Sequence, residues 1–188
     1  MTLTPSNMQE PGTPAPDFAL PDTDGNIVRK SDFSDAAGLL VVFMCNHCPY
    51  VKHIRQGLAD FGAEYQPKGL AMVGINANDA SSHPQDSFDN MVVEKKQAGY
   101  TFPYLHDEPQ TIARAYGAVC TPDFFLYDGK GSLVYRGQFD DSRPGNDIPV
   151  TGKDLRAAAD ALLEGNPVPP NQKPSVGCNI KWKPGNAP

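Results

Sequence analysis

The spacing of hydrophobic positions changes along the chain, and these changes predict the secondary structure. Two continuous apolar runs, 39–44 and 70–75, are typical of strands that helices bury on both faces. After the first run, apolar residues recur every three or four positions, which predicts an amphipathic helix from about Asn46 onward. Similar spacing predicts three further helices, within 88–98, 112–116 and 155–163.

Short apolar segments on either side of turn residues predict two antiparallel strand pairs. The first pair, 18–20 and 26–29, surrounds Asp24-Gly25 and forms an N-terminal hairpin. The second pair, 124–127 and 132–136, surrounds Asp128-Gly129. Strands and helices alternate between the two pairs. This order predicts an α/β fold with a mixed central sheet flanked by helices.

Proline content divides the 188 residues into a single domain with two extensions. Residues 1–16 contain four prolines and are expected to form an extended lead-in with little structure. The domain itself is predicted for 17–164. The C-terminal tail, 165–188, is rich in proline, asparagine and lysine, but it also contains Cys178 and Trp182. Because a simple linker has no use for a tryptophan, we expect the tail to dock on the domain.

Overall charge narrows the classes of partner. The formal charge of −6 disfavours binding to nucleic acid and to anionic membrane surfaces. No segment approaches the ~18 apolar residues that span a bilayer, and the N-terminus lacks the pattern of a signal peptide. We therefore expect a soluble, cytoplasmic protein. In that compartment a CxxC motif is more often catalytic or metal-binding than a permanent disulfide.

The segment Cys45-Asn-His-Cys48 follows the first buried strand and precedes the first helix. A helix N-terminus lowers the pKa of a nearby thiol, and the thiolate is the nucleophile in disulfide exchange. On this basis Cys45 is the attacking thiol, and Cys48, one turn deeper, is the resolving thiol. His47 between them would stabilise the reduced thiolate. Two alternatives remain open: inert cysteines packed in the core, and a metal site.

The segment Cys120-Thr121-Pro122 precedes a predicted apolar strand. Thr121-Pro122 is a candidate cis peptide bond, whose neighbouring backbone could pair with an extended peptide or a small thiol. The alternative is an ordinary trans proline at the start of an edge strand.

In their order along the chain, several segments together resemble the thioredoxin-fold redoxins, and in particular the peroxiredoxin-like branch of the alkyl hydroperoxide reductase and thiol-specific antioxidant family. They are PGTPAPDFALPDTDGNIVRKSDF, LLVVFMCNHCP, MVGINAND and YGAVCTPDFFLYDGKGSLVYRG. The resemblance implies a thioredoxin-like fold in which Cys45 attacks, Cys48 resolves and the loop of Thr121 and Pro122 faces them.

A peroxidase is the second hypothesis, with Cys45 as the peroxidatic thiol. Peroxiredoxins have a threonine three residues before that thiol, whereas this chain has Val42 there, and Cys45 itself stands three before Cys48. Arg136 or Arg143 could still supply the positive charge that such a site needs.

The remaining thiols have several possible roles. The resemblance would place Cys120 across from the CxxC pair, where it could relay a disulfide, bind a metal together with Cys45 and Cys48, or simply pack. Cys178 is either a second resolving thiol, if the tail folds back, or a surface thiol. The favoured hypothesis is a thiol-disulfide oxidoreductase that needs no dissociable cofactor and exchanges electrons with protein or small-molecule thiols and disulfides. The sequence does not predict an oligomeric state.

Overall fold

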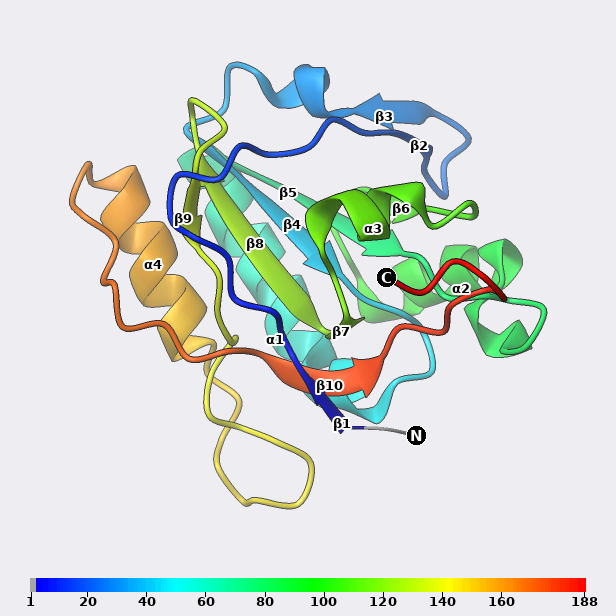
Figure 1. Cartoon of the computed structure of the whole chain (residues 1–188). Helices are drawn as coiled ribbons and strands as arrows, with labels where there is room; N and C mark the ends of the chain where they lie inside the picture. Colours follow the sequence, from blue (N-terminus) through cyan, green and yellow to red (C-terminus); the bar gives the residue numbers. More distant parts are fainter. Residues whose placement is uncertain (1–2) are drawn as a thin grey trace.

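The computed structural model describes residues 3–188, and its centre is a five-stranded mixed sheet (Figure 1). The strand order is β6-β5-β4-β8-β9, in which β4, β5 and β6 are parallel and β8 and β9 are antiparallel to their neighbours. These strands are β4 (Gly38–Phe43), β5 (Leu70–Asn76), β6 (Tyr104–His106), β8 (Asp123–Asp128) and β9 (Leu133–Tyr135).

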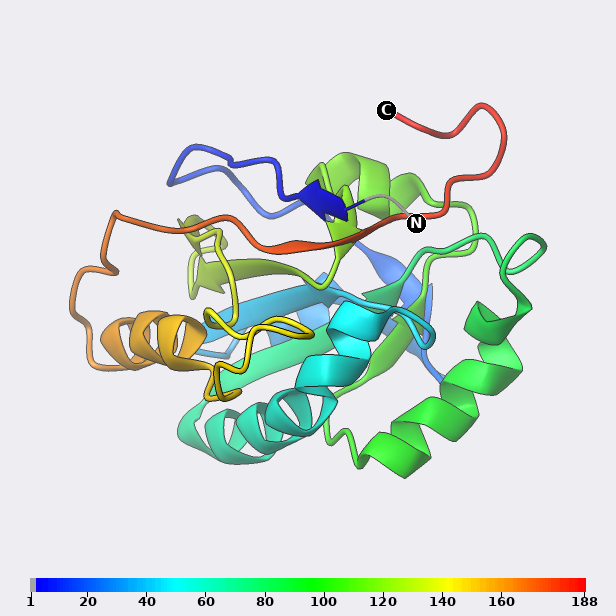
Figure 2. The ribbon, with the colours of Figure 1, turned by 90° about the horizontal axis from the view of Figure 1, so that it is seen from below.

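Helices and a hairpin cover the two faces of this sheet (Figure 2). The helices are α1 (Pro49–Tyr65), α2 (Phe88–Ala98), α3 (Thr111–Tyr116) and α4 (Lys153–Leu163), and the hairpin consists of β2 (Ala19–Pro21) and β3 (Ile27–Arg29). Leu40 and Val42 of β4 pack with α1, α2 and α4 on one face, while Val41 and Phe43 pack with α3 and the hairpin on the other. All six residues of β4 are buried for this reason, as its continuous apolar run predicts.

A separate three-stranded sheet joins the two chain extensions to the domain. Strand β10 (Val176–Asn179) of the tail lies between β1 (Leu3–Pro5) and β7 (Cys120–Thr121), antiparallel to both. In Figure 1, β10 crosses near the beginning of α1, and the two elements are in contact. The lead-in is therefore extended, but it also contributes a strand. Its first two residues lie outside the described part of the chain.

The structure confirms the predicted thioredoxin-like α/β fold and corrects one boundary beside the cysteines. Helix α1 begins at Pro49 with Cys48 as its N-cap, and not at Asn46. Proline disfavours the helical conformation at the residue before it, and Cys48 is accordingly extended, with φ −64° and ψ 124°. Strand β6 was not predicted, because three residues are too few to show a period.

Three short 3₁₀ turns complete the described elements, at Lys30–Phe33, Gln66–Lys68 and Pro84–Asp86. Within residues 3–188, no helix is long and apolar enough to cross a membrane.

Candidate redox site

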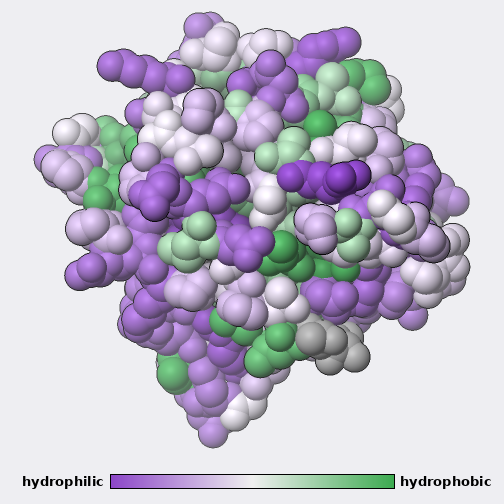
Figure 3. Space-filling view, viewed as in Figure 1, coloured by the Kyte–Doolittle hydropathy of each residue, from purple (hydrophilic) through white to green (hydrophobic). Residues whose placement is uncertain are grey.

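The CxxC pair lies in the turn that connects β4 to α1. Cys45 is 1% exposed and Cys48 is fully buried, so both sulfur atoms are covered by protein. The surface on the side of β10 is mostly hydrophilic, and its apolar residues form small separate groups (Figure 3). Because Cys48 is the N-cap of α1, the helix N-terminus favours a thiolate at Cys48 and not, as the sequence suggested, at Cys45.

The loop of Thr121 and Pro122 faces the pair, and the peptide bond between these two residues is cis. The Thr121 hydroxyl oxygen lies 3.6 Å from the Cys45 Sγ. The Cys48 Sγ lies 3.3 Å from the carbonyl oxygen of Thr121, to which it can donate only when it is protonated. Both cysteines thus contact the same residue, which brings the two sequence landmarks into one site.

Asp86, at the end of the 3₁₀ turn before α2, organises the turn that contains the cysteines. One oxygen of its fully buried carboxylate accepts hydrogen bonds from the backbone N–H groups of Asn46 and His47, at 2.8 and 3.2 Å. The other accepts from the Asn78 amide, at 2.8 Å, and from the His47 ring. Four donors converge on this carboxylate, and they fix the backbone between Cys45 and Cys48.

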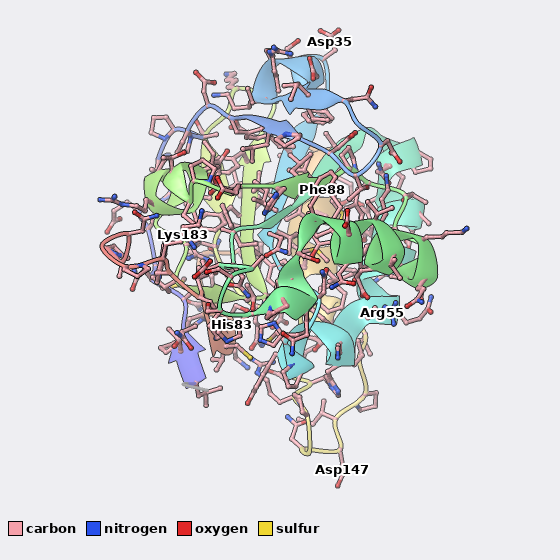
Figure 4. All side chains as sticks on the ribbon, turned by 90° about the vertical axis from the view of Figure 1, so that its right-hand side faces the viewer. Asp35, Arg55, His83, Phe88, Asp147 and Lys183 are labelled. Carbon is pink, nitrogen blue, oxygen red and sulfur yellow. The ribbon has the colours of Figure 1, made fainter. Side chains whose placement is uncertain are left out.

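His47 connects this carboxylate to the first cysteine. Its Nδ1 lies 2.5 Å from the Asp86 carboxylate and 4.0 Å from the Cys45 Sγ. A proton on Nδ1 is therefore directed to Asp86. The ring also stacks on His83, with centroids 5.2 Å apart, and Figure 4 shows His83 on the loop before α2. His47 is only partly buried, so this is the side of the site nearest to solvent.

Cys178 of the tail is the third sulfur at the site, because its Sγ lies 2.6 Å from the Cys48 Sγ. Hydrogen bonds with Cys178 and Cys45 lower the pKa of Cys48, against the opposing effect of burial. Burial raises the pKa of Cys45, and the hydrogen bond to Cys48 and the Asp86 charge act in the same direction. The hydrogen bond to Cys48 raises the pKa of Cys178. The arrangement favours one thiolate, on Cys48, between two protonated thiols.

Cys120 does not take the position across from the pair that the resemblance implied. Its Sγ instead contacts the carbonyl oxygen of Pro122, at 3.8 Å, and burial raises its pKa. The reason is the alternation of side chains along a strand: Thr121 points toward Cys45, so Cys120, one residue earlier, points to the opposite side of β7.

The metal hypothesis with Cys45, Cys48 and Cys120 is not supported by this geometry. Among the described residues, the group that could hold an ion consists of Cys45, His47 and Asp86, whose candidate ligand atoms lie within 4.8 Å of one another. The four hydrogen bonds to Asp86 already account for its buried charge without a metal.

The two arginines considered for a peroxidase site have other partners. The guanidinium of Arg136 is buried against the carboxylate of Asp123. That of Arg143 donates to the Gln138 side chain, at 2.5 Å, and to two backbone carbonyls. Val42 is fully buried in the core on the side of α1. The threonine hydroxyl that does reach Cys45 comes from Thr121.

Asp86 is the important site residue that the sequence did not reveal. It lies in a polar loop with no motif, and its role depends on the approach of that loop to the CxxC turn. Asn78 and Tyr104, whose hydroxyl donates to the Asn46 side chain at 2.8 Å, were missed for the same reason.

Comparison with known proteins agrees with the fold and with a thiol-based redox class. The AhpC/TSA family matches residues 11–136, which is more than half of the chain. The protein therefore belongs to the AhpC/TSA family, whose members are redoxins, and it is a thiol-based oxidoreductase of that class.

Similar proteins include a solved structure and two more distant relatives. An uncharacterised conserved protein from Geobacillus kaustophilus is 54% identical, with a TM-score of 0.96 over 98% of both chains. A candidate peroxiredoxin from Mycobacterium tuberculosis is 27% identical over 62% of this chain and 69% of its own. The thiol-disulfide oxidoreductase ResA of Bacillus thuringiensis is 24% identical over 70% of this chain and 72% of its own.

Proposed function

We propose that the protein is a thiol-disulfide oxidoreductase in which Cys45 attacks a substrate disulfide and Cys48 resolves the mixed disulfide. The principal support is that both sulfur atoms contact Thr121, the residue before the cis proline, at 3.6 and 3.3 Å. Cys45 is the better placed for the attack, because Cys48 is covered by Cys178 and by the Thr121 carbonyl. Cys45 instead adjoins the partly exposed His47.

The reaction begins in the reduced pair, where the Cys45 thiol can donate to the Cys48 thiolate. Transfer of this proton produces the Cys45 thiolate, which attacks one substrate sulfur and releases the other as a thiolate. Cys48 gives the proton to this leaving group and then attacks the Cys45 sulfur. The second substrate thiolate leaves and takes a proton from the medium. The products are a substrate dithiol and a Cys45–Cys48 disulfide.

Reduction of insulin by the protein, with a dithiol as the electron donor, tests this function. We expect Cys45→Ser and Cys48→Ser to lower the initial rate at least a hundredfold. Cys120→Ser, the matched buried cysteine outside the pair, should keep most of the rate. Wild-type turnover no faster than that of the dithiol alone would overturn the proposal.

A thiol peroxidase is the second candidate, supported by the Thr121 hydroxyl beside Cys45 and by the relative named a candidate peroxiredoxin. Hydrogen peroxide in place of insulin tests it with the same dithiol donor. Rapid consumption of peroxide that Cys45→Ser abolishes, together with no insulin reduction, would reverse the order of the two candidates.

A further inference from the structure

The C-terminal tail occupies the strand edge that an extended substrate would use. Strand β10 pairs with β7 in antiparallel register, with Cys178 opposite Thr121 and Asn179 opposite Cys120. Extended peptides commonly bind by adding a strand to an open sheet edge. In this protein the chain itself supplies that strand, and its cysteine is the residue that faces the CxxC pair.

Hydrogen bonds on both sides of Cys178 hold the tail in this position. Before it, Ser175 donates its hydroxyl to the Pro122 carbonyl, at 2.7 Å, and accepts from the Ser6 backbone, at 2.8 Å. After it, the Ile180 N–H donates to the Val119 carbonyl, at 3.0 Å, and the Lys181 N–H donates to the Asn78 side chain, at 2.9 Å. Asn78 also binds Asp86, so the tail is tied to the carboxylate that orders the CxxC turn.

Gly177 makes this close approach possible. A Cβ at this position would lie 1.9 Å from the Thr121 carbonyl oxygen and 2.7 Å from its carbonyl carbon. The obstacle is backbone, which cannot rotate away like the end of a side chain. Any larger residue at 177 would therefore force the tail away from Thr121, and Cys178 away from Cys48.

We propose that Cys178 is a third redox thiol, which accepts the disulfide from the CxxC pair and forms a Cys48–Cys178 bond. The two sulfur atoms are 2.6 Å apart, so a movement of about 0.6 Å reaches the length of a disulfide bond. This inference rests on the proposed function, which supplies the Cys45–Cys48 disulfide.

The exchange needs no external oxidant. The Cys178 thiol loses its proton and attacks the Cys48 sulfur, the Cys45–Cys48 bond breaks, and Cys45 leaves with the electron pair and takes up a proton. One disulfide and one thiol are present before and after the step. In the product the tail is bonded across the edge of β7, with Cys45 reduced, until a dithiol reductant attacks the new bond.

Disulfide mapping of the full chain tests the proposal. The reduced protein is treated with oxidised glutathione and quenched in acid. Free thiols are then labelled with N-ethylmaleimide, and the peptides are digested without reduction and analysed by mass spectrometry. We expect the wild type to contain mainly the Cys48–Cys178 bond with Cys45 labelled. Gly177→Ala should contain mainly Cys45–Cys48 with Cys178 labelled, which is at least a tenfold change in the ratio of the two bonds.

Two further variants make the outcome decisive. Pro174→Ala, at an exposed tail position, should give the wild-type pattern. Cys178→Ser should give the Cys45–Cys48 bond even if Gly177→Ala folds poorly. A wild type that contains mainly Cys45–Cys48 would overturn the inference and leave the proposed function intact. A wild type that forms neither bond and does not reduce insulin would overturn both.

Discussion

Cys120 and Cys178 lie on neighbouring strands, yet only one of them reaches the reactive pair. Cys178 contacts Cys48 at 2.6 Å, while Cys120 contacts the Pro122 carbonyl on the other side of β7. Both are buried, and both have a raised pKa, but burial is the main cause for Cys120 and the hydrogen bond to Cys48 for Cys178. Whether a cysteine contacts the CxxC pair therefore depends more on the side of the strand on which it lies than on its closeness to the cis proline in the sequence.

The largest effect is expected from removal of the carboxylate that holds the CxxC turn. Asp86→Ala leaves two backbone N–H groups and the Asn78 amide without their acceptor, which costs about 3 kcal/mol in the free energy of unfolding. Denaturant titration of the reduced protein measures this loss in the free energy of unfolding. Disulfide mapping of this variant also shows whether the contact between Cys48 and Cys178 depends on the ordered turn.

The matched control for that variant is Asp141→Ala. Asp141 is a more exposed carboxylate that pairs with Lys153 and Lys173 at the surface. Surface ion pairs contribute little, so the free energy of unfolding should change little. An equal loss in both variants would mean that the convergence of donors on Asp86 is not the cause.

A smaller effect is expected at Cys48 when the tail thiol is removed. Cys178→Ala deletes the hydrogen bond that most lowers the pKa of Cys48, so this pKa should rise by at least about one unit, or ~1.4 kcal/mol. Ultraviolet absorbance of the thiolate, followed against pH, measures the change. At a pH between the Cys48 pKa values of the two proteins, the wild type should retain a thiolate that the variant has lost.

The same shift has a consequence for stability. A lowered pKa stabilises the folded, reduced protein above the unfolded pKa, and this contribution is lost as pH falls through the folded pKa of Cys48. The stability advantage of wild type over Cys178→Ala should therefore shrink as the pH falls from the folded pKa of Cys48 in the variant to the lower folded pKa of Cys48 in the wild type. An unchanged difference between neutral and acidic pH would contradict a thiolate at Cys48.

Local patterns predicted much of this molecule, because a period or a turn signal needs only neighbouring residues. The buried strands β4 and β5, the helices and the N-terminal hairpin follow from such patterns. The approach of Thr121 to the CxxC pair follows from the thioredoxin-like fold that the resemblance implies. The sequence predicts the start of α1 three residues too early, because Pro49 is compatible with any position in the first turn, and only the extended conformation of Cys48 shows that the proline is the first helical residue.

Contacts between distant segments could not be predicted in the same way. The meeting of Cys48 and Cys178 depends on the register of β10 against β7, and a shift of one residue would turn Cys178 to the other side. The tail contains no period that fixes this register. Gly177 helps to fix this register, because its lack of a Cβ lets the Thr121 carbonyl lie against it. The sequence alone does not show that this carbonyl lies there.

The smallest effect is expected from removal of Cys120, the cysteine that does not contact the CxxC pair. Cys120→Ala removes one buried sulfur from a packed strand, which costs about 1 kcal/mol in the free energy of unfolding. The thiolate absorbance of Cys48 and the Cys48–Cys178 bond should stay as in the wild type, because Cys120 lies on the opposite side of β7 from Thr121 and the pair. Denaturant titration and thiolate absorbance on the same sample separate the two expectations. A shift in the Cys48 titration as large as that in Cys178→Ala would show that both thiols act on the pair, and that the side of the strand does not distinguish them.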